Sequence, residues 1–566
     1  MTQKILLIIS ACLLAINLSA NTIIITSSAD SGAGTLREAI TNANNGDVIV
    51  FAENVTTVQL ADVIVINKNI TISGNETNNT ILQTWTSNTY KKRYFEILEN
   101  AELTLNHLTL KDHVGNCSGG AIVNEGKLTL NYCIFSNNRP FDNAGAILNH
   151  RILNVENSTF IDNYAPISGG AISNYGIATI DNCIFKSNKA GQSGGAIQNN
   201  NQISISNSVF CQNEAASDGI FRNSSFVSTK GTYNAQATLI NCLFTNNAIT
   251  GGNAASSSPH CIISNYNYDV SDLGHLTLIN CTVADNTGVG VTFWESTTVL
   301  YNTVLWNNVS KFNDQYDICK DTRLANNGIF NAYNSLIGTS NIDLSGNNNI
   351  IGENPLFVGN GDYSLQENSP AIDNGNNLFL PVEITKDLLG NPRISNTAVD
   401  MGAYEFQYEI YYTVTFAGNN ISIVPQIIEY GSLATLPAAP ERENYTFGGW
   451  FTDNGVFANE WHFDTDIVTQ DTTLYAKWNS TSGITEIEST GVKIYPNPVK
   501  DVLIIESGEL KIESVEIYSI AGQLLQSKIV NLQSDIIIDI AHLSSGTYFL
   551  KMQTASGELV QKVIKE

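Results

Sequence analysis

The feature that most constrains this chain is a sequence repeat of 25 residues between Ser118 and Asn213. Each copy opens with Gly-Gly-Ala-Ile or a close variant, and a Phe-x-x-Asn signature follows at a constant offset. The two signatures begin at Gly119, Ala144, Gly169 and Gly194, and at Phe135, Phe160, Phe185 and Phe210. A fixed period in this range is typical of a stacked array, in which no single unit can bury its own apolar face.

Aligned copies of the repeat place aliphatic residues in columns, with polar residues between them. One column holds Leu130, Val155, Ile180 and Ile205, and another holds Ile122, Ile147, Ile172 and Ile197. Alternation with a period of two points these columns inward. An Asn that recurs from Asn157 to Asn334 marks a sharp corner, because Asn tolerates left-handed backbone. We therefore predict an all-β chain whose residues 21–408 form a parallel β-helix.

The cysteines divide into two groups. Cys133, Cys183, Cys242 and Cys281 occupy one repeat column, where other copies carry Ser or Thr, and we expect them to be packing residues. Cys117, Cys211, Cys261 and Cys319 lie outside that column. An oxidising compartment would permit one or two disulfides among these four, in any of three pairings.

The first residues of the chain predict export. Lys4, the apolar run Ile5 to Ile16 and a small-residue exit at Ala20 are typical of a secretory signal peptide over residues 1–20. Thr35 to Asn44 has the apolar spacing of a short amphipathic helix, which we expect to cap the β-helix. The net charge of −25 argues against nucleic acid as a partner.

After Asn213 the period lengthens, since extra residues separate successive coils. Insertions at one position of such an array map to one face, which is often the binding face. The inserted segments carry aromatic residues suited to stacking on sugars or packing against protein. The predicted ligand-binding residues are Tyr266, Tyr268, Trp306, Phe312 and Tyr316.

Charged residues of the regular coils are the candidates for catalysis, because lyases need a cationic base and hydrolases need paired carboxylates. The best candidate cluster is Arg139, Asp142, Arg151 and Asp162, although we favour their interpretation as surface charges that keep the β-rich rod soluble. No spacing of metal ligands is evident. Calcium is conceivable at Asp464, Asp466 and Asp471, but no loop glycine supports it. We expect no cofactor.

The Gly-Gly-Ala-Ile and Phe-x-x-Asn repeats resemble those of polymorphic outer-membrane proteins, which implies a right-handed, pectin-lyase-like β-helix. Asn368 to Asn376, Asp387 to Arg393 and Val399 to Glu405 resemble the closing signature of the choice-of-anchor Q domain. We expect Asp373, Asp387, Arg393, Asp400 and Glu405 to form a salt-bridged end cap rather than a catalytic cluster.

Two further modules follow the β-helix. Residues 409–478, with Tyr445-Thr-Phe-Gly-Gly-Trp-Phe451, resemble the Listeria–Bacteroides repeat, also called the internalin B type. Residues 479–493 have the composition of a linker. Residues 494–566 alternate like a seven-strand β-sandwich and resemble the type A C-terminal sorting domain of the type IX secretion system of Bacteroidetes.

These resemblances imply a protein that crosses the outer membrane by the type IX secretion machinery and is then released or attached to surface lipopolysaccharide. We expect a non-catalytic adhesin that binds an extracellular glycan or a host or matrix protein. The alternative is a polysaccharide lyase or glycoside hydrolase that acts on an extracellular polysaccharide.

Overall fold

The computed structural model describes residues 20–84, 93–115, 118–229, 231–251, 260–268, 274–311, 316–321, 327–409, 411–418, 421–481, 492–506, 510–529, 535–554 and 557–566. Most of the predicted signal peptide and most of the predicted linker lie outside these ranges. The chain divides into two compact units, Met1–Tyr408 and Glu409–Glu566.

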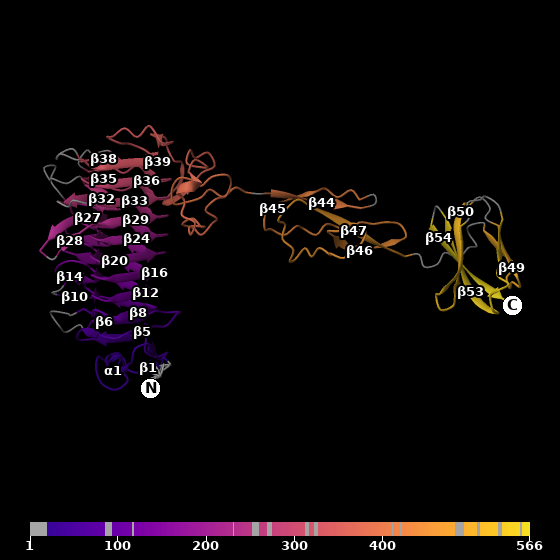
Figure 1. Cartoon of the computed structure of the whole chain (residues 1–566), viewed down its shortest axis with the longest axis horizontal. Coiled ribbons are helices and arrows are strands. Elements are labelled where there is room, and N and C mark those ends of the chain that lie inside the picture. Colours follow the sequence, from indigo (N-terminus) through magenta and orange to yellow (C-terminus); the bar gives the residue numbers. More distant parts are fainter. Residues whose placement is uncertain are drawn as a thin grey trace, which may run out of the picture. The chain divides into compact units, whose positions relative to one another are not determined.

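The first unit is built from three long parallel sheets (Figure 1). The first sheet runs from β1 (Thr22–Ile25) to β39 (Ile329–Tyr333), the second from β3 (Thr57–Leu60) to β41 (Ile350–Ile351), and the third from β4 (Ile64–Ile66) to β38 (Ile318–Lys320). Each coil adds one strand to each sheet, so the predicted parallel β-helix is confirmed.

The four copies of the repeat supply successive strands of these sheets. The first sheet receives β12 (Lys127–Asn131), β16 (Ile152–Glu156), β20 (Ile177–Asp181) and β24 (Gln202–Ser206); the second receives β13 (Ile134–Ser136), β17 (Thr159–Ile161), β21 (Ile184–Lys186) and β25 (Val209–Cys211); the third receives β11 (Ile122–Asn124), β15 (Ile147–Asn149), β19 (Ile172–Asn174) and β23 (Ile197–Asn199). Equivalent residues pair directly, as Phe135 does with Phe160.

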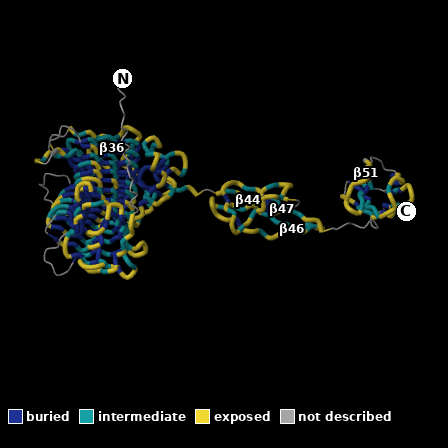
Figure 2. Tube along the Cα trace, turned by 60° about the horizontal axis from the view of Figure 1, so that its bottom comes forward, coloured by how far each residue is buried: buried dark blue, intermediate teal, exposed yellow. Residues whose placement is uncertain are grey.

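The core is a set of stacked side chains that runs through the coils, and Figure 2 shows buried residues along their interior. Phe135, Phe160, Phe185, Phe210 and Phe244 form a continuous stack with ring centroids 4.3–5.0 Å apart. The aliphatic columns expected from the repeat are buried beside it.

Buried asparagines form two hydrogen-bonded ladders along the coils. In one, the side-chain amides of Asn124, Asn149, Asn174, Asn199 and Asn223 each donate to the side-chain oxygen of the next Asn over 2.7–2.8 Å, and the ladder ends at Asn265. The other begins at Asn138 and ends where the Asn308 amide donates to Asp317. These bonds satisfy polar groups that would otherwise be buried without partners.

The predicted corner is confirmed, because every Asn from Asn157 to Asn334 in that column has a positive φ of 47–55°. The neighbouring cysteine column is also confirmed as packing: Cys133, Cys183, Cys242 and Cys281 are buried free thiols. Cys211 and Cys261 are free thiols too, so neither joins a disulfide in this structure. Cys319 packs against Cys261, and Cys117 lies outside the described residues.

At the amino-terminal end, the predicted helix is α1 (Leu36–Asn42), which buries Leu36, Ala39 and Ile40 against the first coils. The Thr35 side chain caps it by accepting a hydrogen bond from the Glu38 amide. Arg37, in the first turn of this helix, donates to the Asp30 carboxylate and to the Val63 carbonyl, so its role is structural.

Residues 353–406 form a compact module on the flank of the β-helix, which corrects the expectation of an end cap. Its backbone bonds the amides of Asn241, Asn280 and Asn302, which belong to three successive coils of the Asn corner. Tyr363 and Tyr404 cover Leu243 and Ala284 of the second sheet. The end of the core is instead met by Ile342 and Leu344.

The second unit contains two small β modules, each with its own core. In the first, β44 (Tyr411–Ala417), β45 (Gln426–Glu429), β46 (Tyr445–Phe451) and β47 (Thr472–Ser480) form one sheet around Trp450. In the second, seven strands form two sheets, as predicted; they are β48 (Lys493–Tyr495), β49 (Val502–Glu506) and β52 (Ile536–Asp539), and β50 (Ile512–Ser519), β51 (Leu524–Ile529), β53 (Gly546–Thr554) and β54 (Gly557–Lys565).

Candidate functional site

The coils after Asn213 keep their register through the insertions. Phe210 pairs with Phe244, Phe244 with Val283 and Val283 with Leu305. The extra residues flank both ends of the third-sheet strands: β27 (Phe221–Ser228) continues into a hairpin with β28 (Gly231–Tyr233), and residues 250–260 precede β32 (Cys261–Tyr268). The irregular region is therefore centred on the third sheet.

Equivalent outward-facing positions on successive strands of the third sheet form a row, and this row includes a charged residue where the insertions begin. Cross-strand neighbours in this row are Val123, Leu148, Ser173, Gln198, Arg222, Ser264 and Thr292. The charged member, Arg222, lies four residues after Asp218, and its Nε is 3.6 Å from the Asp218 carboxylate. The Asp218 side chain is only 2% exposed, against 20% for Arg222.

Aromatic side chains surround Arg222. Its guanidinium carbon lies 6.0 Å from the ring centre of Tyr266 and 5.7 Å from that of Tyr268, and its Nη2 donates to the Tyr268 hydroxyl over 3.2 Å. The Tyr268 ring lies 5.4 Å from Trp294 of β35 (Val289–Trp294). We call Arg222, Tyr266, Tyr268 and Trp294 the Arg222 face. Cation–π contact and packing hold its rings in fixed positions.

Burial dominates the electrostatics beneath this face. Desolvation raises the pKa of Asp218, and the nearby Arg222 charge opposes that rise. Burial alone would lower the pKa of Arg222, but Asp218, Tyr268, Tyr266 and Cys261 together outweigh it and the pKa is raised. The Cys261 thiol donates to Asp218 over 3.1 Å, and burial raises the pKa of that thiol. The ion pair thus anchors Arg222 from below.

The predicted aromatic residues are divided by the structure. Tyr266 and Tyr268 meet in the Arg222 face. Trp306 instead packs under the flank module beside Phe357, and Tyr316 packs against the Cys261 and Cys319 cluster. Phe312 lies outside the described residues.

The four candidate catalytic residues lie at two different corners. Arg139 follows β13, where its Nε bonds the Asn137 side chain over 2.8 Å, and Asp142 accepts from the Asn143 amide. Asp162 occupies the left-handed position after β17. Arg151 lies between β15 and β16 and pairs with Glu99 at 3.0 Å. Among the described residues, no ion pair joins either arginine to Asp142 or Asp162.

Sequence reasoning missed Asp218, Arg222 and Trp294. Asp218 occupies the repeat column of Ser168 and Ser193, and Arg222 that of Ser173 and Gln198. A search for the coil in which two aligned columns become charged together would have found the pair.

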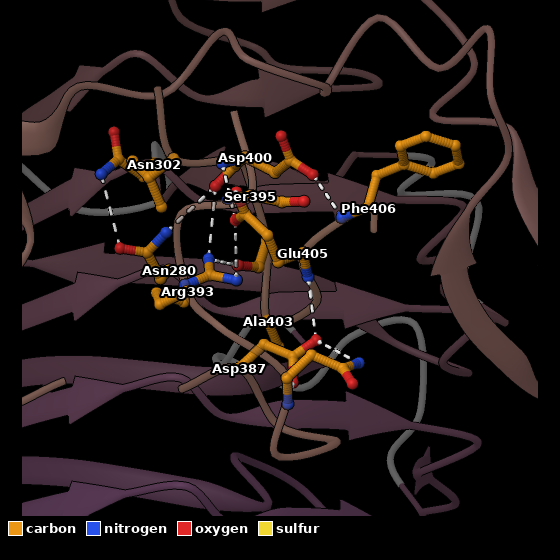
Figure 3. Close-up of polar contacts among 12 residues, drawn as sticks. Asn280, Asn302, Asp387, Arg393, Ser395, Asp400, Ala403, Glu405 and Phe406 are labelled. Carbon is orange, nitrogen blue, oxygen red and sulfur yellow. Dashed lines mark hydrogen bonds and ion pairs between the residues drawn. The ribbon is translucent and has the colours of Figure 1, made fainter. Parts of the chain in front are cut away.

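The carboxylates of the flank module form a structural cluster (Figure 3). Arg393 is buried, its Nη1 is 3.5 Å from Glu405, and its Nη2 donates to the carbonyls of Asp400 and Gly402. Asp387 accepts backbone N–H bonds from Leu389, Asn391 and Glu405. Asp373 accepts from Ala398, and burial raises the pKa of Asp400 to about 6 and of Glu405 to about 8. Among the described residues only Glu405 forms an ion pair with Arg393, and Asp373, Asp387 and Asp400 are held by backbone N–H groups, so the expected salt bridging is limited to one pair.

Within the described part of the chain, no group of three or more His, Cys, Asp or Glu side chains is placed to hold a metal ion. In the same residues, no helix has the length and apolar character needed to cross a membrane.

Comparison with known families identifies both modules of the second unit. The Listeria-Bacteroides repeat domain matches residues 412–477, and the secretion system C-terminal sorting domain matches residues 493–566. The sorting domain implies engagement of the type IX secretion machinery and export to the cell surface or the medium.

Two relatives are proteins of Evansella cellulosilytica. A "Putative Gly-rich membrane protein" is 43% identical over 81 residues, which is 14% of this chain and 9% of the relative. A "Putative membrane protein" is 41% identical over 87 residues, which is 15% of this chain and 13% of the relative. The chain thus spans only 9% and 13% of the length of these curated relatives.

Among solved structures, pectate lyase Pel9A matches 69% of this chain and 97% of its own, with a TM-score of 0.36 and 15% identity. The PL6 family alginate lyase AlyGC matches 59% of this chain and 40% of its own, with a TM-score of 0.26 and 15% identity. Likenesses at this level carry no inference about substrate or chemistry.

Proposed function

We propose that this chain is an exported, non-catalytic binding protein that engages an extracellular ligand through the Arg222 face. The observation that supports the proposal is the contact of Arg222 with Tyr268, whose ring in turn packs against Trp294. Rings that are already immobilised offer contact area with little loss of conformational entropy on binding. A guanidinium among them adds a charged donor, and such residues are enriched at binding hot spots.

We infer how the protein is exported and retained from the roles of its individual segments. Residues 1–20 act as a signal peptide, residues 21–408 form the binding β-helix, and residues 494–566 direct type IX export and are then removed. Residues 409–478, with the linker 479–493, space the β-helix from the sorting domain. The flank module supplies the choice-of-anchor Q ending, and lipopolysaccharide is the proposed attachment when the protein is retained.

The test is a glycan and matrix-protein array probed with the full secreted chain, followed by titration of the strongest ligand. Tyr268→Ala and Trp294→Ala should each weaken binding at least about tenfold, as truncation of an aromatic hot spot does. Tyr132→Ala is the matched control, because Tyr132 is an exposed ring stacked on His107 at 4.9 Å, far along the chain from the Arg222 face.

Product analysis on the same polysaccharides separates binding from catalysis. Chain shortening by the purified protein would contradict the non-catalytic proposal and favour the lyase or hydrolase alternative. If it occurred, the double variant Arg139→Ala, Asp142→Ala would show whether those residues take part. Equal binding by the wild type, Tyr268→Ala and Trp294→Ala would show that the ligand does not bind at the Arg222 face.

A further inference from the structure

A groove of about 430 Å³ crosses several coils at the corner where third-sheet strands turn into the first sheet. Lys127, His150, Arg151, Ile152 and Ile177 line it. It lies in the regular repeat, whereas the Arg222 face lies where the insertions begin. Its volume falls within the usual range for small-ligand sites, which is about 300–1,000 Å³.

Two glycines make the floor of the groove possible. A Cβ added to Gly126 would lie 2.3 Å from the Ala101 carbonyl oxygen, and one added to Gly176 would lie 2.1 Å from that of Arg151. In these two coils there is no room for a Cβ, so the backbone lines the groove there, whereas Arg151 and Asn201 occupy the equivalent position of the other coils. The side chain of Arg151 projects from the coil between the two glycines.

The basic side chains of the groove each have a glutamate partner. The lining includes Lys127, Arg151, His150 and the carboxylate of Glu102, and His150 Nε2 is 3.8 Å from Glu125. Lys127 Nζ is 3.3 Å from Glu102, and Arg151 Nη2 is 3.0 Å from Glu99. All four side chains are substantially exposed, and ion pairs of this kind contribute little to stability, so an incoming anion can replace the glutamates.

Apolar surface lies beside these cations. Ile152, the first residue of β16, is 43% exposed, and Ile177, the first residue of β20, is 48% exposed. The His150 ring stacks on Tyr175 with centroids 5.4 Å apart, which continues a flat surface along the corner. A pyranose ring has an apolar face and a polar rim, and this combination matches it.

We propose that this corner groove binds a saccharide bearing an anionic group, a carboxylate or a sulfate. The anion lies between Lys127 and Arg151, and the sugar ring rests over the isoleucines and His150. Arg151 already holds a carboxylate oxygen, that of Glu99, through its Nη2, and a guanidinium is suited to carboxylate and sulfate groups. The site is separate from the Arg222 face, so it stands or falls independently of the function proposed above.

The experiment is calorimetric titration of the full chain with three trisaccharides of the same linkage: one of hexuronates, one of sulfated hexoses and one of neutral hexoses. Binding of either anionic probe, with the neutral one at least tenfold weaker, supports the site and identifies which anion it prefers. Raising the salt concentration should weaken the anionic interaction, because exposed charges are screened.

The double variant Lys127→Gln, Arg151→Gln should weaken anionic binding at least tenfold. Lys189→Gln is the matched control and should bind as the wild type does, since Lys189 is equally exposed and pairs with Glu214 on the next coil at 2.6 Å. Tyr268→Ala should also leave this binding intact. Equal affinity for the neutral trisaccharide, unchanged binding by the double variant, or no binding of any probe would overturn the proposal.

Discussion

At the scale of single residues, the two glycines of Gly-Gly-Ala-Ile are favoured for different reasons, the first for its backbone conformation and the second for its close contact with the next coil. The first has a positive φ of 61–69° at Gly119, Gly169, Gly194 and Gly219, and Ala144 adopts a similar value of 62° in the variant copy. The second lies against the next coil: a Cβ on Gly145 or Gly170 would be 1.9 Å from a carbonyl oxygen of the following copy. Alanine is therefore tolerated at the first position and excluded at the second.

Gly170→Ala should destabilise the β-helix by at least about 3 kcal/mol, the upper end for overpacking, because the atom it meets is backbone that cannot rotate away. Denaturant unfolding followed by circular dichroism measures this. Gly346→Ala is the control and should shift the midpoint little, since nothing lies within 4 Å of its added Cβ. Similar midpoints for the two variants would contradict the stacking argument.

The Asn ladder predicts a second residue effect. Asn163 accepts from the Asn138 backbone and side-chain amides, and its own amide donates to the Phe135 carbonyl and to Asn188. Asn163→Ala leaves buried partners without hydrogen bonds and should cost about 3 kcal/mol. Asn154→Ala, on the outward side of the first sheet, should cost far less. Hydrogen exchange would show whether the loss is confined to the neighbouring coils, as a stacked array requires.

At the scale of elements, the flank module should respond to pH. Asp400 and Glu405 have pKa values raised by burial to about 6 and about 8, above the ordinary 3.8 and 4.5. The folded module therefore binds more protons than the unfolded chain over this interval, and its stability should fall as pH rises through about 8. Protection factors of the Gly402 and Ala403 amides, which donate to Asn302 and Thr282, report the change.

Glu405→Gln removes the higher of the two titrations, so the decline in protection between about pH 6 and pH 8 should flatten. Glu367→Gln is the control, because this exposed carboxylate belongs to the same module and should leave the decline unchanged. Protection that stays constant over this interval in the wild type would show that the Arg393 charge already compensates Glu405.

Elements that repeat were predictable from sequence because each is constrained by its copies. The Phe stack, the Cys column and the Asn corner follow from aligning the copies, and even the stretched coils keep the pairing of Phe210 with Phe244. The flank module was placed wrongly because its docking depends on amides of Asn241, Asn280 and Asn302, which alignment explains only as corner residues. Asp218 and Arg222 were missed because these positions are charged in one coil alone, so the repeated pattern does not predict them.

At the scale of the whole molecule, the proposed binding function and the export signal belong to separate parts of the chain. The described residues of the β-helix core all come from the first unit, and the sorting domain has its own core around Val515 and Leu550. Deleting the sorting domain should therefore leave the packing of the β-helix intact, which makes the export role testable by truncation.

A chain that ends at residue 481 should fold its β-helix normally but remain in the periplasm of a host with type IX secretion, because the sorting domain is gone. Cell fractionation and protease accessibility of intact cells measure this, and surface material should fall to the background of a secretion-deficient strain. Internal deletion of residues 411–481 is the control and should preserve export, since it leaves residues 493–566 intact. Surface display of the truncated chain would show that export depends on a signal outside the sorting domain.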